Sequence, residues 1–170
     1  TRLASIEKDN YLTEIELRTV VFKEIRAMQA WCLEKDIGFD IGELTANVMT
    51  DSKWIAFIVR QLLSNAIKYS PVKSEIFIFT EIDSSGATLL HIKDAGMGIR
   101  AEDLPRIFQK SYTGTAGRES AQSTGMGLYL AQNIAQKIGV RISVQSVVGE
   151  GSVFTLRFPL QNEYVKLTGR

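Results

Sequence analysis

Side chains that can bind a metal ion or a phosphate share one side of a long predicted helix, residues 52–69. Gln61, Asn65, Lys68 and Tyr69, within the stretch QLLSNAIKYS, fall in an arc of roughly 100° when the segment is helical. An amide in mid-helix can hold a metal-bound water or a phosphate, and an ammonium can pair with a phosphate. The same four residues would also suit a solvated helix flank, and this segment alone leaves both interpretations open.

A carboxylate followed by glycines marks a second stretch, DAGMGI. Asp94 ends a predicted apolar strand, and Gly96 and Gly98 come directly after it. A carboxylate fixed at a strand end can accept a hydrogen bond from an exocyclic amine, and glycines beside it let the backbone approach a flat ring. An ordinary turn at the end of a strand has the same composition, so the stretch is weak evidence by itself.

The third stretch, STGMGL, opens a helix expected from about Gly125 to Gly139. Backbone N–H groups at the start of a helix bind phosphate oxygens with help from the helix dipole. An N-cap followed by flexible glycines is the alternative interpretation. The stretch is neither a P-loop nor a dinucleotide-binding turn, because it lacks both spacings.

Composition limits the class of protein. The 170 residues fit one domain, and 20 basic against 19 acidic side chains create no field that favours nucleic acid, so we expect no nucleic-acid partner. Cys32, the single cysteine, allows no disulfide within the chain and lies in an apolar helical pattern, which indicates a buried residue. The apolar run WIAFIV is too short to span a bilayer.

Periodicity predicts an α+β sandwich, with helices grouped between strands. Helices are expected over residues 14–37 and 52–69, the latter capped by Asp51-Ser52 and ending before Pro71, with a short helix near 102–108 and another over 125–139. Extended segments are expected over 38–49, 75–82, 87–95, 140–148 and 152–160.

In order and spacing, these three stretches and GEGSVFTLRFP resemble the N, G1, G2 and G3 boxes of one family. That family is the ATP-binding catalytic domain of bacterial sensor histidine kinases, grouped with DNA gyrase, Hsp90 and MutL ATPases. The resemblance covers about residues 12–160. It implies a Bergerat-type fold, in which a mixed, mostly antiparallel sheet packs on three main helices. A mobile lid over the nucleotide is expected at about residues 109–124.

The resemblance also implies the cofactors and the roles of single residues. ATP would bind with Mg²⁺, Asn65 would coordinate the metal, Lys68 would contact a phosphate and Tyr69 would pack near the adenine. Asp94 would receive the adenine amine. Gly96 and Gly98 would shape the pocket floor. Further contacts with ATP are expected from Ile99, Lys110, Arg118, Thr124, Gly125, Met126, Gly127, Leu128 and Thr155.

Two departures from the family pattern are informative. Gln61 stands where hydrolytic members carry the glutamate that activates water, and an amide is no general base at neutral pH. This favours phosphoryl transfer to a protein over hydrolysis of ATP. The segment IFQKSYT differs from the usual I-F-E-R-F-Y-R, because Thr113 replaces a basic residue. Lys110 and Arg118 are the candidates to supply that charge, and Lys110 joins Asn65 and Lys68 in the expected catalytic set.

The phosphate acceptor is expected outside this chain. His91 is the only histidine, lies inside a predicted strand and lacks the acidic neighbour of a family acceptor, so a structural role is predicted. Residues 1–12 are interpreted as the remnant of a preceding dimerisation helix, 13–160 as the ATPase domain and 161–170 as a C-terminal tail. The chain alone is expected to be monomeric, and the whole kinase homodimeric.

The amino-acid sequence of the predicted lid also resembles that of a narrower group. This group consists of intramembrane-sensing kinases that respond to bacitracin and similar peptides beside an ABC transporter. This resemblance implies the cytoplasmic domain of a membrane sensor, with a response regulator as its downstream partner. Two other functions stay open. One is an ATPase or serine kinase of the same fold that acts alone, and the other is a nucleotide sensor without catalysis.

Overall fold

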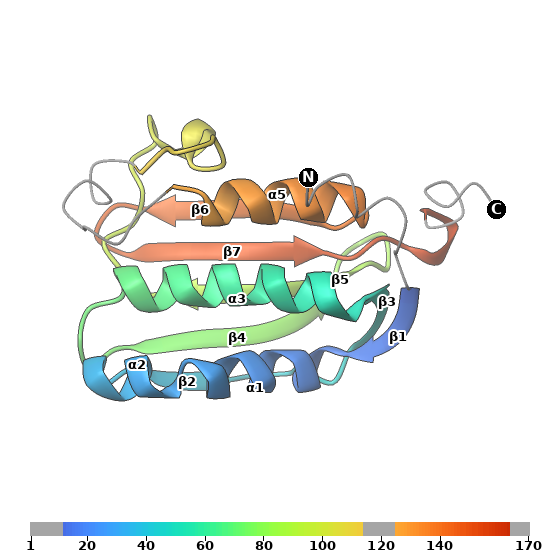
Figure 1. The fold of residues 1–170 in the computed structure, drawn as a ribbon, viewed down its shortest axis with the longest axis horizontal. Helices are drawn as coiled ribbons and strands as arrows, with labels where there is room; N and C mark the ends of the chain where they lie inside the picture. The colour runs from blue at the N-terminus through green and yellow to red at the C-terminus, as the bar shows by residue number, and fades with distance from the viewer. Residues whose placement is uncertain (1–11, 114–124, 164–170) are drawn as a thin grey trace.

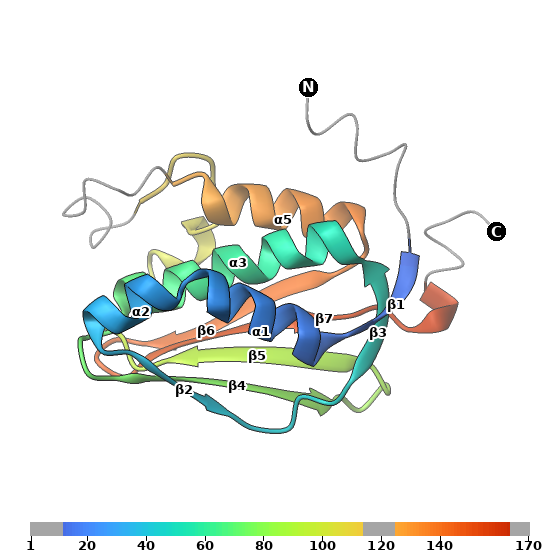
Figure 2. The same ribbon diagram turned by 60° about the horizontal axis from the view of Figure 1, so that its bottom comes forward.

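The computed structural model describes residues 12–113 and 125–163, and its framework is a five-stranded sheet with helices on one face (Figures 1 and 2). The strand order is β2-β4-β5-β7-β6, in which β2 and β4 are parallel and all other neighbours antiparallel. This confirms the predicted mixed, mostly antiparallel sheet. The strands are β2 (Gly38–Ile41), β4 (Glu75–Ile82), β5 (Thr88–Asp94), β6 (Arg141–Val147) and β7 (Gly151–Arg157).

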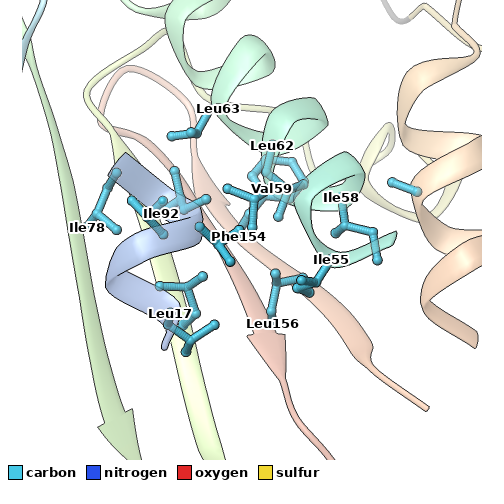
Figure 3. Close-up of a cluster of buried hydrophobic side chains, with 14 of the residues drawn as sticks. Leu17, Ile55, Ile58, Val59, Leu62, Leu63, Ile78, Ile92, Phe154 and Leu156 are labelled. Atoms are coloured by element: carbon cyan, nitrogen blue, oxygen red, sulfur yellow. The ribbon is translucent and has the colours of Figure 1, made fainter. Parts of the chain in front are cut away.

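Three main helices cover the sheet, as predicted: α1 (Leu17–Ala27), α3 (Ser52–Tyr69) and α5 (Gly127–Lys137). The middle one, α3, lies between the other two and packs against both. Its buried stripe meets side chains from α1 and from the sheet in the core that Figure 3 shows. The core residues labelled there are Leu17, Ile55, Ile58, Val59, Leu62, Leu63, Ile78, Ile92, Phe154 and Leu156.

The bounds of α3 agree with the sequence prediction. The Asp51 side chain accepts hydrogen bonds from the backbone N–H groups of Lys53 and Trp54, at 3.0 and 3.2 Å. These bonds satisfy two of the amides that a helix start leaves without a partner. Ser70 is extended and Pro71 follows it, so the helix ends where a proline disfavours its continuation.

The N-terminal part corrects the prediction of one helix over residues 14–37. Strand β1 (Leu12–Glu16) pairs antiparallel with β3 (Asn47–Asp51) in a separate two-stranded sheet. The helical region is also divided, because α1 ends at Ala27 and α2 (Gln29–Lys35) follows Met28. Residues 1–11 lie outside the described part, whereas Leu12, placed in the expected remnant, already pairs in β1.

Three smaller features complete the fold. The turn between β4 and β5 is held by the Asp83 carboxylate, which accepts hydrogen bonds from the N–H groups of Ser85 and Ala87. The short helix near 102–108 is a single 3₁₀ turn, η1 (Leu104–Arg106). The tail is partly fixed, since the Glu163 carboxylate bonds the Leu160 N–H at 2.7 Å and Arg157 at 3.3 Å.

Cys32 is buried, as its apolar surroundings predicted, and burial raises the pKa of its thiol. Over the described ranges, 12–113 and 125–163, the helices are too short or too polar for any to cross a bilayer.

Candidate functional site

The C-terminal end of α3 lies against the stretch DAGMGI. A Cβ atom at position 96 would lie 2.6 Å from the Tyr69 carbonyl oxygen and 2.8 Å from Asp94 Oδ1. Real Cβ atoms do not approach other atoms so closely, so only glycine fits here without a shift of the backbone. The structure therefore joins Tyr69, Gly96 and Asp94 into one wall.

Asp94 is the buried carboxylate of this wall, with 5% of its surface exposed. Its Oδ1 accepts a hydrogen bond from the Gly96 N–H at 2.9 Å, and the backbone N–H of Ser152 also bonds the carboxylate. Burial raises the pKa of Asp94, and these two bonds partly oppose the shift. The side chain lies on the same face of β5 as Leu90 and Ile92, the face that the helices cover.

The N-terminal end of α5 also lies against α3, at Gln61. A Cβ atom at position 127 would lie 2.4 Å from Gln61 Oε1, so Gly127 and Gln61 are in direct contact. Since residues four apart share one side of a helix, Asn65 stands between Gln61 and Tyr69. It is partly exposed, and within the described ranges its side-chain amide makes no hydrogen bond. The amide is therefore available to a ligand.

The turn between β6 and β7 closes the opposite side of DAGMGI. The Gly149 N–H donates to the Met97 carbonyl at 2.8 Å, and the Ile99 N–H donates to Ser146 Oγ at 2.7 Å. Gly98 has a φ of +74°, and a Cβ atom there would lie 2.2 Å from the Val147 carbonyl oxygen, so both the backbone angle and the space require glycine. Each of the four sequence stretches thus adjoins at least one of the others.

The residues at the two ends of the predicted lid lie close together in the structure. The Ser111 N–H donates to the Gly125 carbonyl at 3.1 Å, which joins the two ends of the segment 111–125. Within the described start of this segment, the Tyr112 hydroxyl donates to the Asp103 carboxylate, which also accepts a hydrogen bond from Arg100 at 3.0 Å. These two donors lower the pKa of Asp103. Residues 114–124, with the predicted contacts Arg118 and Thr124, lie outside the described part.

The remaining predicted contacts surround this region. Lys68 Nζ lies 5.1 Å from the centre of the Tyr69 ring, and both side chains are partly exposed. Ile99 and Leu128 pack against the core, and Met126 Sδ lies 3.9 Å from Ser111 Oγ. Lys110 is exposed at the start of the predicted lid.

Thr155 is a correction. Its Oγ1 lies 2.7 Å from His91 Nδ1, and the two residues are directly paired between β5 and β7. Because side chains alternate along a strand, this pair faces away from the helices and from Asp94. Thr155 is therefore not an adenine contact.

Ser152 is the residue of β7 that the sequence prediction missed. It pairs with Asp94 in the register, is buried, and bonds Ser146 Oγ at 2.8 Å through its own hydroxyl. Counting in twos back from the buried Phe154 would have placed it on the site face.

His91 has the structural surroundings that were predicted. It is buried on the outer face of the sheet, with its ring stacked on Phe79 at 4.7 Å between centroids. Its Nε2 lies 2.6 Å from a Glu81 carboxylate oxygen, and Thr155 engages the other ring nitrogen. Both nitrogens are thus engaged by neighbours in the protein.

A metal ion at this site would depend on its nucleotide. Among the described residues, no group of three or more His, Cys, Asp and Glu side chains is arranged to hold a metal. Mg²⁺ is commonly bound through one or two protein oxygens together with phosphates and waters. The Asn65 amide, which has no hydrogen-bond partner among the described residues, fits that requirement because it offers one neutral oxygen ligand near the start of α5.

Comparison with known proteins gives one family. A family model described as histidine kinase-, DNA gyrase B- and HSP90-like ATPase matches residues 50–162. The chain is 47% identical over 163 residues to sensor protein BceS of Bacillus subtilis, which covers 96% of this chain and 48% of the relative. It is 43% identical over 167 residues to sensor protein kinase GraS of Staphylococcus aureus, covering 98% and 48%. The chain therefore spans about half the length of these curated relatives.

Solved structures share the fold. The mycobacterial sensor histidine kinase MprB aligns with a TM-score of 0.75 over 88% of this chain and 97% of that one, at 21% identity. ShkA in complex with AMPPNP aligns with a TM-score of 0.77 over 93% of this chain and 33% of that one, at 18% identity. The chain belongs to the family of histidine kinase-, DNA gyrase B- and HSP90-like ATPases, and ATP is the nucleotide that its domain binds.

Proposed function

We propose that the chain is the catalytic unit of a sensor histidine kinase and transfers the γ-phosphoryl group of ATP to a histidine on a separate dimerisation domain. The observation that carries this proposal is the meeting of three segments on α3, where Gln61 contacts Gly127 and Tyr69 contacts Gly96 beside Asp94. Relatives over nearly the whole chain are named sensor proteins, and a fold neighbour is solved with AMPPNP.

The adenine lies against the wall formed by Tyr69, Gly96 and Asp94. A carboxylate accepts hydrogen bonds and, while ionised, donates none, so Asp94 selects a ring that carries an exocyclic amine. The Gly96 and Ser152 amides hold the carboxylate in place. Exclusion of water by the buried strand end strengthens this contact.

The phosphates lie along the exposed side of α3 toward the start of α5. The amide of Asn65 would hold Mg²⁺, and Lys68 and Lys110 would pair with phosphate oxygens. The ion, when bound, neutralises charge that develops on the phosphates. Backbone N–H groups at the start of α5 add the positive end of a helix dipole. This chain therefore contributes position and charge, which supply most of the catalysis in phosphoryl transfer.

The acceptor is a protein side chain and not water. Gln61 contacts the N-terminus of α5, where it would lie near the phosphates, and its neutral amide takes no proton from water at neutral pH. His91 is held on the opposite face of the sheet, away from Asp94. The phosphoryl group therefore leaves for a histidine outside this chain.

The curated relatives are about twice as long as this chain, and the proposed partners follow from the comparison with them. We propose a homodimeric membrane sensor that passes its phosphoryl group to a response regulator. A bacitracin-type peptide as the stimulus and an ABC transporter as a neighbour remain part of this proposal. This chain alone would be its cytoplasmic, monomeric catalytic part.

The test is phosphorylation in trans of the separate histidine-bearing domain, with the wild-type chain and Asn65→Ala. We expect Asn65→Ala to abolish transfer and to remove the increase in ADP affinity that Mg²⁺ gives the wild type. Asn47→Ala makes the same chemical change at an exposed position of β3 and should have no effect. Unchanged transfer by Asn65→Ala would refute the metal assignment.

The alternative functions give different results in the same assay. A lone ATPase would release inorganic phosphate from ATP without any acceptor domain, and a serine kinase would leave phosphate on an acid-stable ester. A nucleotide sensor would bind ADP but phosphorylate nothing.

A further inference from the structure

A lysine from a neighbouring helix holds the C-terminal end of α3. Lys35 is the last residue of α2, and its ammonium donates to the carbonyl oxygens of Ile67, Lys68 and Ser70, at 2.6, 3.1 and 2.7 Å. An ammonium carries three N–H donors and no acceptor. All three donors of the Lys35 ammonium therefore bond carbonyl groups at the C-terminal end of α3.

These bonds give partners to two of the last four carbonyl groups of α3. The last carbonyl groups of any helix lack partners within the helix. In α3 the Ala66 carbonyl receives the Ser70 N–H at 3.0 Å, and Lys35 serves Ile67 and Lys68. The Tyr69 carbonyl is the one that lies against Gly96. A cation here also lies at the negative end of the helix dipole, where it is stabilising.

The connection between the two helix ends runs in both directions. The carbonyl oxygen of Lys35 accepts a hydrogen bond from the Lys73 N–H at 3.1 Å, just beyond the end of α3. Main chain and side chain of one residue therefore fix the ends of α2 and α3 relative to each other. Figure 1 shows these ends on the same side of the molecule.

The turn that Lys35 holds carries part of the candidate nucleotide site. The carbonyl groups that it bonds belong to Ile67, Lys68 and Ser70. Lys68 is the expected phosphate contact, and Lys68 and Ser70 flank Tyr69. Tyr69 lies directly against Gly96 and so sets the position of the wall that holds Asp94. A shift of this turn would move contacts for both ends of the nucleotide at once.

We infer that Lys35 is a positioning residue for nucleotide binding, which acts by fixing the last turn of α3. This inference rests on the proposed function. Lys35 has no need to touch the nucleotide, because its effect passes through the backbone of residues 67–70. Placement errors of about an ångström are enough to weaken a site strongly, which makes such a residue matter.

The test is the ADP affinity of the 170-residue chain, measured by calorimetry for the wild type, Lys35→Met and Lys35→Arg. Methionine keeps the length of the side chain and removes every donor. We expect the Kd of Lys35→Met to rise about tenfold, which corresponds to about 1.4 kcal/mol. Lys35→Arg, whose guanidinium offers several donors, should recover most of the wild-type affinity.

A matched control and a stability measurement separate positioning from folding. Lys23→Met makes the same change at an exposed position of α1 and should leave the Kd unchanged. Thermal unfolding without nucleotide is recorded for each variant, and binding is measured well below the transition. Should Lys35→Met fail to fold, Lys35→Gln replaces it, since its amide retains two donors and should cause a smaller loss.

Three results would overturn the inference. The first is a Kd for Lys35→Met equal to that of the wild type, even if its melting temperature falls. The second is Lys35→Arg binding no better than Lys35→Met, and the third is Lys35→Gln, where it is the variant used, binding as the wild type does. A wild-type chain without ADP affinity would refute the proposed function itself, and with it this inference.

Discussion

The Asp94 carboxylate lowers the stability of the fold at neutral pH and is proposed to strengthen nucleotide binding. Its carboxylate is buried beside two backbone N–H donors, and burial raises its pKa above the ordinary value. A group whose pKa is higher in the folded state stabilises the fold below its unfolded pKa. That contribution is lost as the pH rises through the folded pKa. At neutral pH the ionised carboxylate therefore destabilises the fold. The proposed hydrogen bond to the nucleotide would offset this destabilisation.

Asp94→Asn should separate these two effects. We expect the ADP affinity to fall at least about tenfold, because hydrogen bonds to charged groups contribute about 1.5–3 kcal/mol. The melting temperature at neutral pH should stay the same or rise, since asparagine carries no charge to bury and can still accept the Gly96 N–H. Calorimetry and thermal unfolding measure the two quantities on one sample. An equal Kd would remove Asp94 from the adenine site.

Residues within strands show what the sequence prediction of the site rested on. Asp94 was assigned through the resemblance of four motifs together, because its own stretch has the composition of an ordinary turn, and its contact with adenine stays a prediction. Thr155 was assigned from its motif without a count of strand alternation, and that count places Ser152 on the site face instead. Lys35 carried no sequence signal, because its three acceptors lie more than 30 residues away.

At the scale of elements, α3 is the helix on which the site depends, and its start is fixed by one side chain. Asp51 caps it through the N–H groups of Lys53 and Trp54. Asp51→Ala should lower the free energy of unfolding by about 1 kcal/mol, the usual cost of a lost N-cap. Urea denaturation measures this as a lower midpoint with an unchanged slope.

Asp51→Asn is the matched control for this prediction, because asparagine caps helices about as well as aspartate. It should unfold at a urea concentration close to that of the wild type. An alanine variant as stable as the asparagine variant would show that the cap bonds contribute nothing.

Elements with a strong local signal were predictable, and those fixed by distant partners were not. The helix over 52–69 had a cap, a regular apolar stripe and a terminating proline, and its bounds are correct. Residues 14–16 share the period of the following helix, yet they form β1 because β3, more than 30 residues later, pairs with them. Periodicity describes one segment at a time and cannot detect such a partner.

At the scale of the whole molecule, the fold brings together segments that are separated by up to 90 residues of sequence. The helix α3 makes this possible, because one of its sides contacts the strand end at Gly96 and the start of α5 at Gly127. The order of the four motifs in the sequence predicted that they would lie close together in the fold. The contacts through which they meet, such as Gln61 with Gly127, depend on packing that the motifs do not contain.

The account is tested most directly by a titration of the isotope-labelled chain with ADP and Mg²⁺, followed by NMR. The backbone amides of Asn65, Gly96 and Gly127 should all shift, and the three curves should give a single Kd. A response at all three positions would place the separated motifs around one nucleotide. If one of the three were unmoved at saturation, or followed a different Kd, the segments would not share a site and the kinase proposal would fail.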